Sequence, residues 1–321
     1  MLRYLTFHLW IMNQFYSRYS GFVNAVGLFD GKRGDVVSSE KTKGGCESEK
    51  GLYFCGYRGN GRGCHKHPVL RQGADFAVAR KRLALDVNAA ARACFDSGYD
   101  EVLVCDGHAD MENLLIEDLD ERIKLLSGAM RQSLQMEAID SSFDAYISFG
   151  HAGAGLTPGG VIDHCYNGGK VYNLRFNGIT MNTETVANAA MAGHYGVPLV
   201  ACIGDAALAK EVQAFVPNCE AIVVKEGVSR FAAISIHPNK ARQLIYDGVK
   251  AGLDRRDQIQ PLHLGDQVTM EVDYKDSNMA DTAMLIPGMR RLSQRTVAYT
   301  GDAETVFKLH ELMLYRLVDK L

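Results

Sequence analysis

The chain has 321 residues, of which 47% are hydrophobic and 23% are charged, and its formal net charge is −3. This is the composition of a soluble globular protein with room for a large and a small domain, and the near-neutral charge argues against nucleic acid as a main partner. The apolar N-terminal stretch LTFHLWIM is too short to span a membrane, so we expect no membrane partner. The eight cysteines lack paired spacing, which favours reduced core thiols in a cytoplasmic protein.

The first 73 residues carry no sustained helical or strand period. They are rich in Gly, Ser, Lys and Arg, and so long a patternless stretch is unusual before a compact domain. We predict that residues 1–73 form an atypical N-terminal segment, either poorly ordered or translated in the wrong reading frame.

The densest cluster in this segment is YFCGYRGNGRGC, residues 53–64, which His65 and His67 follow. The cluster lacks the G-x-x-x-x-G-K-[ST] spacing of a phosphate-binding loop. A zinc knuckle built from Cys55, Cys64 and the two histidines stays open as an alternative, although no second cysteine pair stands at the usual spacing.

Residues 74–265 alternate helical and strand patterns. Apolar side chains recur at helical spacing over residues 74–98, and Gly98 stands where a C-terminal cap belongs. Short β-rich runs and further helical segments then follow, the runs at 101–105, 145–150, 198–204 and 221–225 and the helices at 183–196, 205–215 and 238–253. Apolar strands that alternate with helices predict an α/β domain, with a mostly parallel sheet flanked by helices.

The pattern changes after residue 265. Residues 267–274 alternate like a strand, 277–286 form a short helix, and 295–300 form a second strand. Asp302 then caps a final helix. We predict that residues 74–265 are one α/β domain and that 266–321 are a small α+β C-terminal unit.

Polar residues suited to a metal stand where the predicted strands end. Asp106 and His108 follow one strand, His151 follows another, and Glu184 opens a helix. The carboxyl ends of parallel strands share one sheet edge, and imidazole and carboxylate both suit zinc, so His108, His151 and Glu184 are candidate zinc ligands. His164, in the Gly-rich stretch TPGGVIDHC, is a candidate proton carrier.

Each of these residues also has a plainer interpretation. A lone His after a strand is more often a loop residue bonded to the backbone. Asp106 could simply cap a helix over MENLLIEDL, residues 111–119, and Glu184 could be a favourable first-turn carboxylate. Spacing alone therefore supports an α/β protein, with a metal-dependent hydrolase as one alternative.

Four blocks of the chain resemble, in the same order, blocks of the zinc-dependent D-aminopeptidase family found with dipeptide-transport operons. They are EVLVCDGHADMENLL, DAYISFGHAGAGLTPGGVIDHCY, NGITMNTETVANAAMAGHYGVPLVACIGD and VKEGVSRFAAISIHP. The resemblance runs from about Asp75 to the C-terminus, roughly three-quarters of the chain. It implies two zinc ions per chain with His108, His151 and Glu184 among their ligands, and it implies that His164 is catalytic.

The resemblance fails in one place. The family's first two ligands stand in an S-x-D-x-E-G motif on an N-terminal strand, and YFCGYRG, residues 53–59, occupies that position instead. Synonymous codons exist for residues 48–67 that, read one base later, encode RKKVYISADIEGTAGVVTS, which restores the motif. We therefore interpret this stretch as an out-of-frame reading of the metal-binding strand, because a site with two cations needs such carboxylates.

The sequence thus predicts a zinc metallo-aminopeptidase that releases N-terminal D-amino acids, such as D-Ala, from short peptides, but that is inactive or nearly so as written. The resemblance also implies a homo-oligomeric ring. One alternative is a non-catalytic remnant of the same fold that binds peptide, or metal weakly. Another is a metal-dependent hydrolase of esters or phosphoesters on the same scaffold.

Overall fold

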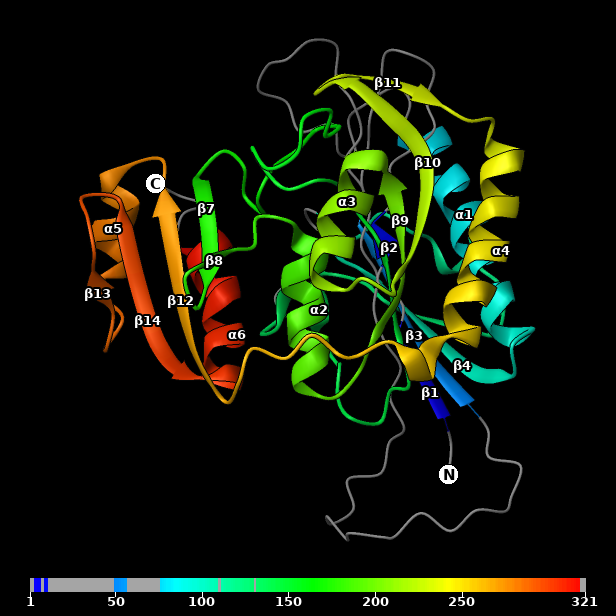
Figure 1. The fold of residues 1–321 in the computed structure, drawn as a ribbon, viewed down its shortest axis with the longest axis horizontal. Coiled ribbons are helices and arrows are strands. Elements are labelled where there is room, and N and C mark those ends of the chain that lie inside the picture. The colour runs from blue at the N-terminus through cyan, green and yellow to red at the C-terminus, as the bar shows by residue number, and fades with distance from the viewer. Residues whose placement is uncertain are drawn as a thin grey trace, which may run out of the picture.

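The computed structural model describes residues 76–108, 111–129 and 131–317, together with the backbone of three strands nearer the N-terminus. Two sheets, drawn right of centre in Figure 1, carry the parallel strands. The first has the order β2-β3-β1-β4-β5 and is parallel throughout, and the second has the order β6-β9-β10-β11, with only β11 antiparallel. The strands are β1 (Arg3–Thr6), β2 (Leu9–Trp10), β3 (Glu49–Gly56), β4 (Tyr99–Asp106), β5 (Ile123–Leu126), β6 (Tyr146–Phe149), β9 (Leu199–Asp205), β10 (Glu220–Ser229) and β11 (Ala232–Ser235).

Helices cover both faces of these sheets. Helices α1 (Phe76–Phe95) and α4 (Pro238–Asp254) lie on one face, and α2 (Glu184–His194) and α3 (Ala206–Phe215) lie on the other (Figure 1). All residues of α2 from 184 to 193 are buried, which accounts for its run of small and apolar side chains. The predicted helix over 74–98 is confirmed, and Gly98 has the left-handed backbone of a C-terminal cap (φ 90°).

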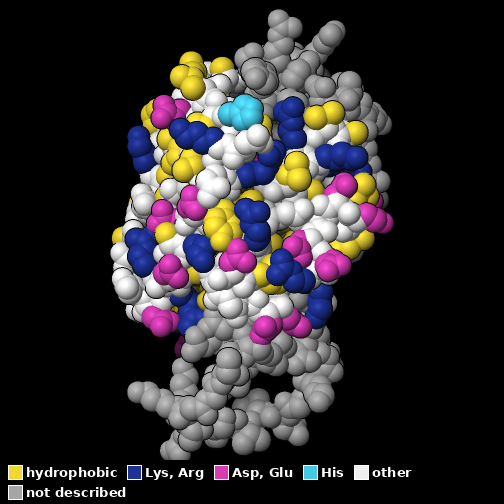
Figure 2. Space-filling view, turned by 90° about the vertical axis from the view of Figure 1, so that its right-hand side faces the viewer, with side chains coloured by type: hydrophobic (Ala, Val, Ile, Leu, Met, Phe, Trp, Pro, Cys, Tyr) yellow, Lys and Arg dark blue, Asp and Glu magenta, His cyan; other side chains and the backbone are white. Residues whose placement is uncertain are grey.

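The surface of the α1–α4 face carries charges of both signs. Figure 2 shows Lys and Arg side chains interspersed with Asp and Glu over this side of the molecule. Beneath this surface an ion pair joins the two helices, with Nε of Arg242 lying 3.1 Å from Oδ1 of the buried Asp86. No helix in the described part of the chain is both long and apolar enough to cross a membrane.

A third sheet is antiparallel throughout and has the order β13-β14-β12-β7-β8. The elements of this layer are β7 (Val171–Phe176), β8 (Ile179–Thr180), β12 (Gln267–Tyr274), α5 (Ser277–Ala283), β13 (Arg290–Arg291), β14 (Thr296–Asp302) and α6 (Ala303–Glu311). Helix α6 continues into a π-helical turn over Leu312–Arg316 and lies between this sheet and α2 (Figure 1). Val272 of β12 pairs with Leu174 on one side and Val297 on the other, so alternate apolar side chains build one buried face.

The prediction of a mixed α/β fold is confirmed, and the predicted parallel arrangement describes the first two sheets but not the third. Strand β7 pairs with β12, and β8 pairs with β7. Since β7 and β8 come from residues 171–180, the antiparallel sheet contains strands from before and after residue 265. The division into residues 74–265 and 266–321 stays a prediction.

Most of the N-terminal segment, residues 1–73, lies outside the described residues, and so does the Cys/His cluster beyond Gly56. Three strands form where the sequence shows no strand period, and β3 runs parallel to β4. Backbone pairing explains this, because the N–H and C=O groups along β4 need partners whatever side chains the neighbouring strand carries. The interpretation of this segment as mis-framed stays a prediction.

His310 lies fully buried in α6 and packs edge-on against the ring of Tyr166, with ring centroids 4.3 Å apart. Neither of its ring nitrogens has a hydrogen-bond partner among the described residues. Burial lowers the pKa of His310 from 6.5 to about 3, because a charged imidazole is poorly solvated there.

The buried His310 should make the fold acid-sensitive. Its pKa is depressed in the folded chain, so its contribution to stability is complete above pH 6.5 and is lost as the pH falls from 6.5 towards 3. The unfolding free energy of the unmodified chain should fall as the pH is lowered from about 7 to about 5. In His310→Leu this fall should be smaller by about 2 kcal/mol, as measured by urea denaturation. Changing the exposed His237→Asn is the control, and an unchanged pH slope in His310→Leu would contradict the assignment.

Candidate metal centre and active site

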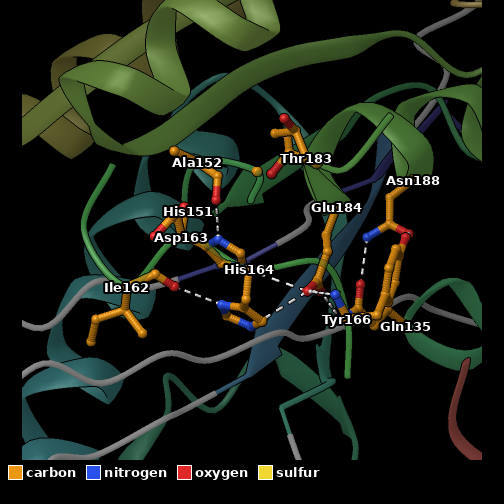
Figure 3. A network of polar contacts seen from close by, with 12 residues as sticks. Gln135, His151, Ala152, Ile162, Asp163, His164, Tyr166, Thr183, Glu184 and Asn188 are labelled. Atoms are coloured by element: carbon orange, nitrogen blue, oxygen red, sulfur yellow. Dashed lines mark hydrogen bonds and ion pairs between the residues drawn. The ribbon is translucent and has the colours of Figure 1, made fainter. Parts of the chain in front are cut away.

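Three of the four predicted site residues come together. His151, His164 and Glu184 each offer one potential ligand atom, and these atoms all lie within 4.8 Å of one another. His151 follows β6, His164 stands in the loop after it, and Glu184 is the first residue of α2, so two sheet-edge segments and a helix start meet here (Figure 3). All three side chains are buried.

A hydrogen bond to a backbone carbonyl group fixes which ring nitrogen carries a hydrogen in each imidazole. Nδ1 of His151 lies 2.6 Å from the carbonyl oxygen of Ala152, and Nδ1 of His164 lies 2.7 Å from that of Ile162. A carbonyl oxygen only accepts hydrogen bonds, so each Nδ1 carries a hydrogen and Nε2 is the nitrogen that each ring can offer to a metal. Metal-binding histidines are commonly oriented in this way by a second contact.

Both Nε2 atoms face the carboxylate of Glu184. Nε2 of His151 lies 3.5 Å from Oε1 of Glu184, and Nε2 of His164 lies 3.6 Å from the same oxygen. These distances are too long for hydrogen bonds. They are close to the ~3.3 Å that separates two ligand atoms of a tetrahedral zinc ion with bonds of ~2.0–2.1 Å. The spacing between either histidine nitrogen and the Glu184 oxygen therefore fits two ligands of one zinc ion.

The two rings are stacked rather than convergent. Their centroids are 3.9 Å apart and their planes differ by only 12°. A metal ligand binds along the in-plane lone pair of imidazole, and one ion cannot lie in two parallel planes. In this arrangement one histidine can serve as a full ligand while the other stands beside it as a proton donor or acceptor.

A closed ring of hydrogen bonds holds the carboxylate of Glu184. Oε2 accepts from the side-chain amide of Gln135 (2.7 Å), and Oε1 accepts from the backbone N–H of Tyr166 (2.8 Å). Asn188 donates to Gln135 (2.6 Å), and the hydroxyl of Tyr166 donates to Asn188 (3.1 Å). A carboxylate only accepts, so Glu184 sets the direction of every bond in this buried ring, visible in Figure 3.

Two buried carboxylates anchor the loop between the histidines. Glu211 accepts from the backbone N–H of Gly153 (2.7 Å) and from the hydroxyl of Thr183 (2.6 Å). Asp205 accepts from Val161 N–H (2.9 Å), and burial raises the pKa of both acids. A Cβ on Gly153 would lie 2.6 Å from the Thr183 nitrogen, so only glycine lets the loop approach the start of α2 this closely.

The fourth predicted residue, His108, is not part of this group among the described residues. Its side chain is buried at the end of β4, and its carbonyl oxygen accepts from Met111 N–H (2.8 Å) and from the Asn113 side chain (3.0 Å). The assignment of His108 as a ligand stays a prediction.

Asp106 does not cap a regular helix. Residues 111–119 contain only a 3₁₀ turn, Ile116–Asp118. The Asp106 carboxylate instead accepts from Leu114 N–H (2.7 Å) and from the backbone and side chain of Asn113. Burial raises its pKa to about 6. The alternative in which Asp106 caps a helix over 111–119 is therefore wrong, because these side-chain bonds stabilise a loop in place of helical backbone pairing.

Sequence reasoning missed Gln135, Asn188 and Glu211. Gln135 stands in the 3₁₀ turn Leu134–Met136, and the other two lie inside helices. The one signal in the sequence is that each of these polar residues stands among apolar ones. Its meaning becomes clear only once the tertiary fold brings the three side chains beside the histidines.

A buried His/His/Glu set at the carboxyl edge of a parallel α/β sheet is a donor set of the kind that metal-dependent hydrolases use. The profile of the D-aminopeptidase family (peptidase family M55) matches residues 63–313, so the chain belongs to that family. A D-aminopeptidase of Bacillus subtilis (strain 168) is 30% identical over 242 residues, which cover 75% of this chain and 86% of that protein.

A solved structure also matches the fold. It is described as the Zn-dependent D-aminopeptidase DppA from Bacillus subtilis, a self-compartmentalizing protease, and it superposes with a TM-score of 0.73 at 28% identity. The match covers 77% of this chain and 89% of that one. The family profile begins at residue 63, which is after the stretch in which the S-x-D-x-E-G motif is missing.

Proposed function

We propose that this protein is a zinc-dependent aminopeptidase that releases N-terminal D-amino acids, such as D-Ala, from short peptides. The observation that carries the proposal is the buried group of His151, His164 and Glu184, whose ligand atoms lie within 4.8 Å of one another in a chain of the D-aminopeptidase family. The matching structure is described as Zn-dependent, which supports zinc as the metal.

His151 and Glu184 would hold the zinc, and the family resemblance adds His108. Zinc, when bound, supplies Lewis-acid polarisation of the scissile carbonyl and activation of water. The Ala152 carbonyl keeps the lone pair of His151 turned towards Glu184. Gln135 and the Tyr166 backbone keep the Glu184 carboxylate from rotating, so the ligands are oriented before any metal arrives.

His164 would be the proton carrier. Its ring stacks on His151, so it lies beside the proposed ligands without sharing their plane. Its Nδ1 is committed to the Ile162 carbonyl, so proton exchange takes place at Nε2. At this atom a proton can be taken from the attacking water and delivered to the leaving amine of the peptide.

A second candidate is a non-catalytic remnant of the family that binds peptide, or metal weakly. The missing S-x-D-x-E-G motif favours it, because a two-metal site without these carboxylates lacks much of its negative charge. Restoring the S-x-D-x-E-G motif distinguishes the two candidates. An enzyme whose metal-binding strand is out of frame then holds stoichiometric zinc, and a remnant does not.

We further propose a homo-oligomer, since the matching structure is described as a self-compartmentalizing protease. Sedimentation of the purified chain measures the assembly directly. A cytoplasmic location is supported by the described cysteines at 94, 105, 165, 202 and 219, which are buried and free. We retain the proposed division into an atypical segment over 1–73, a catalytic domain over 74–265 and a small unit over 266–321.

The test uses a frame-restored chain, in which RKKVYISADIEGTAGVVTS replaces residues 48–66. We expect it to release D-Ala from a D-Ala dipeptide but not L-Ala from the L-isomer, and to lose activity when zinc is chelated. His164→Ala should lower turnover by ~10²-fold or more while zinc stays bound, because proton transfer is lost and the proposed ligands are kept. Unchanged turnover, or loss of zinc from this variant, would contradict the assigned role.

A further inference from the structure

The backbone of Ile162 is strained at a position that decides where His164 points. Its φ is 53°, a left-handed conformation that β-branched residues rarely adopt. Both of its backbone polar groups are engaged. The N–H donates to the Arg230 carbonyl oxygen (2.7 Å), and the C=O accepts from Nδ1 of His164 (2.7 Å). The orientation of this residue therefore links the His164 ring to Arg230.

Arg230 stands in the turn of the β10–β11 hairpin, which extends past the helices at the carboxyl edge of the sheet (Figure 1). Its side chain also holds the residue next to His164. Nε lies 2.9 Å from Oδ1 of Asp163, and Nη2 donates to the Asp163 carbonyl oxygen (2.8 Å). Arg230 thus contacts both residues that precede His164, one through its backbone and one through its side chain.

The hairpin backbone also lies directly against the loop. A Cβ on Gly227 would lie 1.8 Å from the carbonyl oxygen of Gly159, so the two backbones touch where only glycine fits. The β10–β11 pairing is irregular between Gly227 and Ser229, and such a bulge bends a strand. The bent hairpin therefore packs directly against the loop that carries His164.

We propose that Arg230 is a positioning residue that fixes the His164 ring through Asp163 and the strained Ile162. This inference rests on the proposed catalytic role of His164. The Arg230–Asp163 pair contributes little to stability, because the side chains are 50% and 24% exposed and surface ion pairs are weak. Its contribution is geometric, since it holds an unfavourable backbone conformation that aims the ring at Glu184.

The chain offers a matched control. Arg122 and Asp120 form an ion pair of 2.8 Å whose side chains are 49% and 25% exposed, almost the same as in the proposed pair. Arg122 lies against Phe95, at the end of α1. Arg122→Gln therefore removes an equivalent surface interaction without touching the His164 loop.

In the frame-restored chain, Arg230→Gln should lower kcat about 10-fold or more with KM within about twofold, because the ring is misplaced while the substrate site is kept. Arg122→Gln should leave both constants unchanged. Asp163→Asn should show a similar defect, and the double variant should be no worse than the worse single one, because the two residues act as one unit. Gly227→Ala, which pushes the hairpin off the loop, should give the same loss of kcat.

A second measurement does not depend on turnover. Solid-state ¹⁵N spectra of histidine-labelled chain, with the His164 signal assigned by difference from His164→Ala, report which ring nitrogen carries the hydrogen. We expect Nδ1–H alone in the unmodified chain and in Arg122→Gln, and a mixture of tautomers in Arg230→Gln. A spectrum of Arg230→Gln identical to that of the unmodified chain overturns the inference, whatever its activity. A changed spectrum with unchanged kcat supports Arg230 as positioning and instead counts against the catalytic role of His164.

Discussion

Glu184→Gln should remove zinc from the frame-restored chain and nearly abolish its peptidase activity. The variant replaces a carboxylate that lies 3.5 Å and 3.6 Å from the two histidine nitrogens with a neutral amide. We expect zinc affinity to fall by at least ~100-fold, because the negative charge of a proposed direct ligand is lost. The measurements are zinc content by atomic absorption and D-Ala release.

The same variant should also weaken the fold. Gln135 and the Tyr166 backbone both donate to Glu184, so the NH2 group of an amide at this position would face another donor unless the side-chain hydrogen bonds of the ring reverse. We expect a loss of about 1–3 kcal/mol of unfolding free energy. Glu311→Gln is the control, since that carboxylate is also buried but pairs with Arg316. Full zinc occupancy in Glu184→Gln would refute the assigned ligand.

The chain as written should hold less zinc than the frame-restored chain and show little or no activity. β3 ends at Gly56, and its Cys55 pairs with Asp106, two residues before His108. Restoring the frame changes Gly56→Asp and Arg58→Glu, which supplies carboxylates at or just past the end of this strand. At ~4 Å and an effective dielectric of ~20, one charge interaction is worth about 4 kcal/mol, so replacing a cation with an anion there has a large effect on a bound metal.

The test compares the written chain, the frame-restored chain and a version of the latter with Asn and Gln in place of the two restored acids. Zinc per chain and D-Ala release should be high only when both carboxylates are present. The amide version separates the effect of charge from that of a better-formed strand, because its apolar residues are the same. Two zinc ions and full activity in the written chain would eliminate the frame-shift interpretation.

Much of the fold could be predicted from the sequence because local patterns record burial. The apolar period over 74–98 and the runs that became β4, β6, β9 and β10 report directly on side chains that face a core. The antiparallel sheet was only partly visible, because β7 pairs with β12 across about a hundred residues of chain and β8, which pairs with β7, has only two residues. Pairing over that distance depends on tertiary packing and leaves no local period.

The sequence by itself determined the residue types available at the strand ends, and the family resemblance assigned them roles. Only the tertiary structure decided that His164 stacks on His151 and shares the site with Glu184, while His108 stays outside that group among the described residues. It also decided that Gln135, 49 positions from Glu184, orients its carboxylate, and that Arg230, 67 positions from Asp163, contacts the loop of His164. The physical reason is that hydrogen bonds and ion pairs depend on distances of about 3 Å in space, and sequence spacing does not encode such distances.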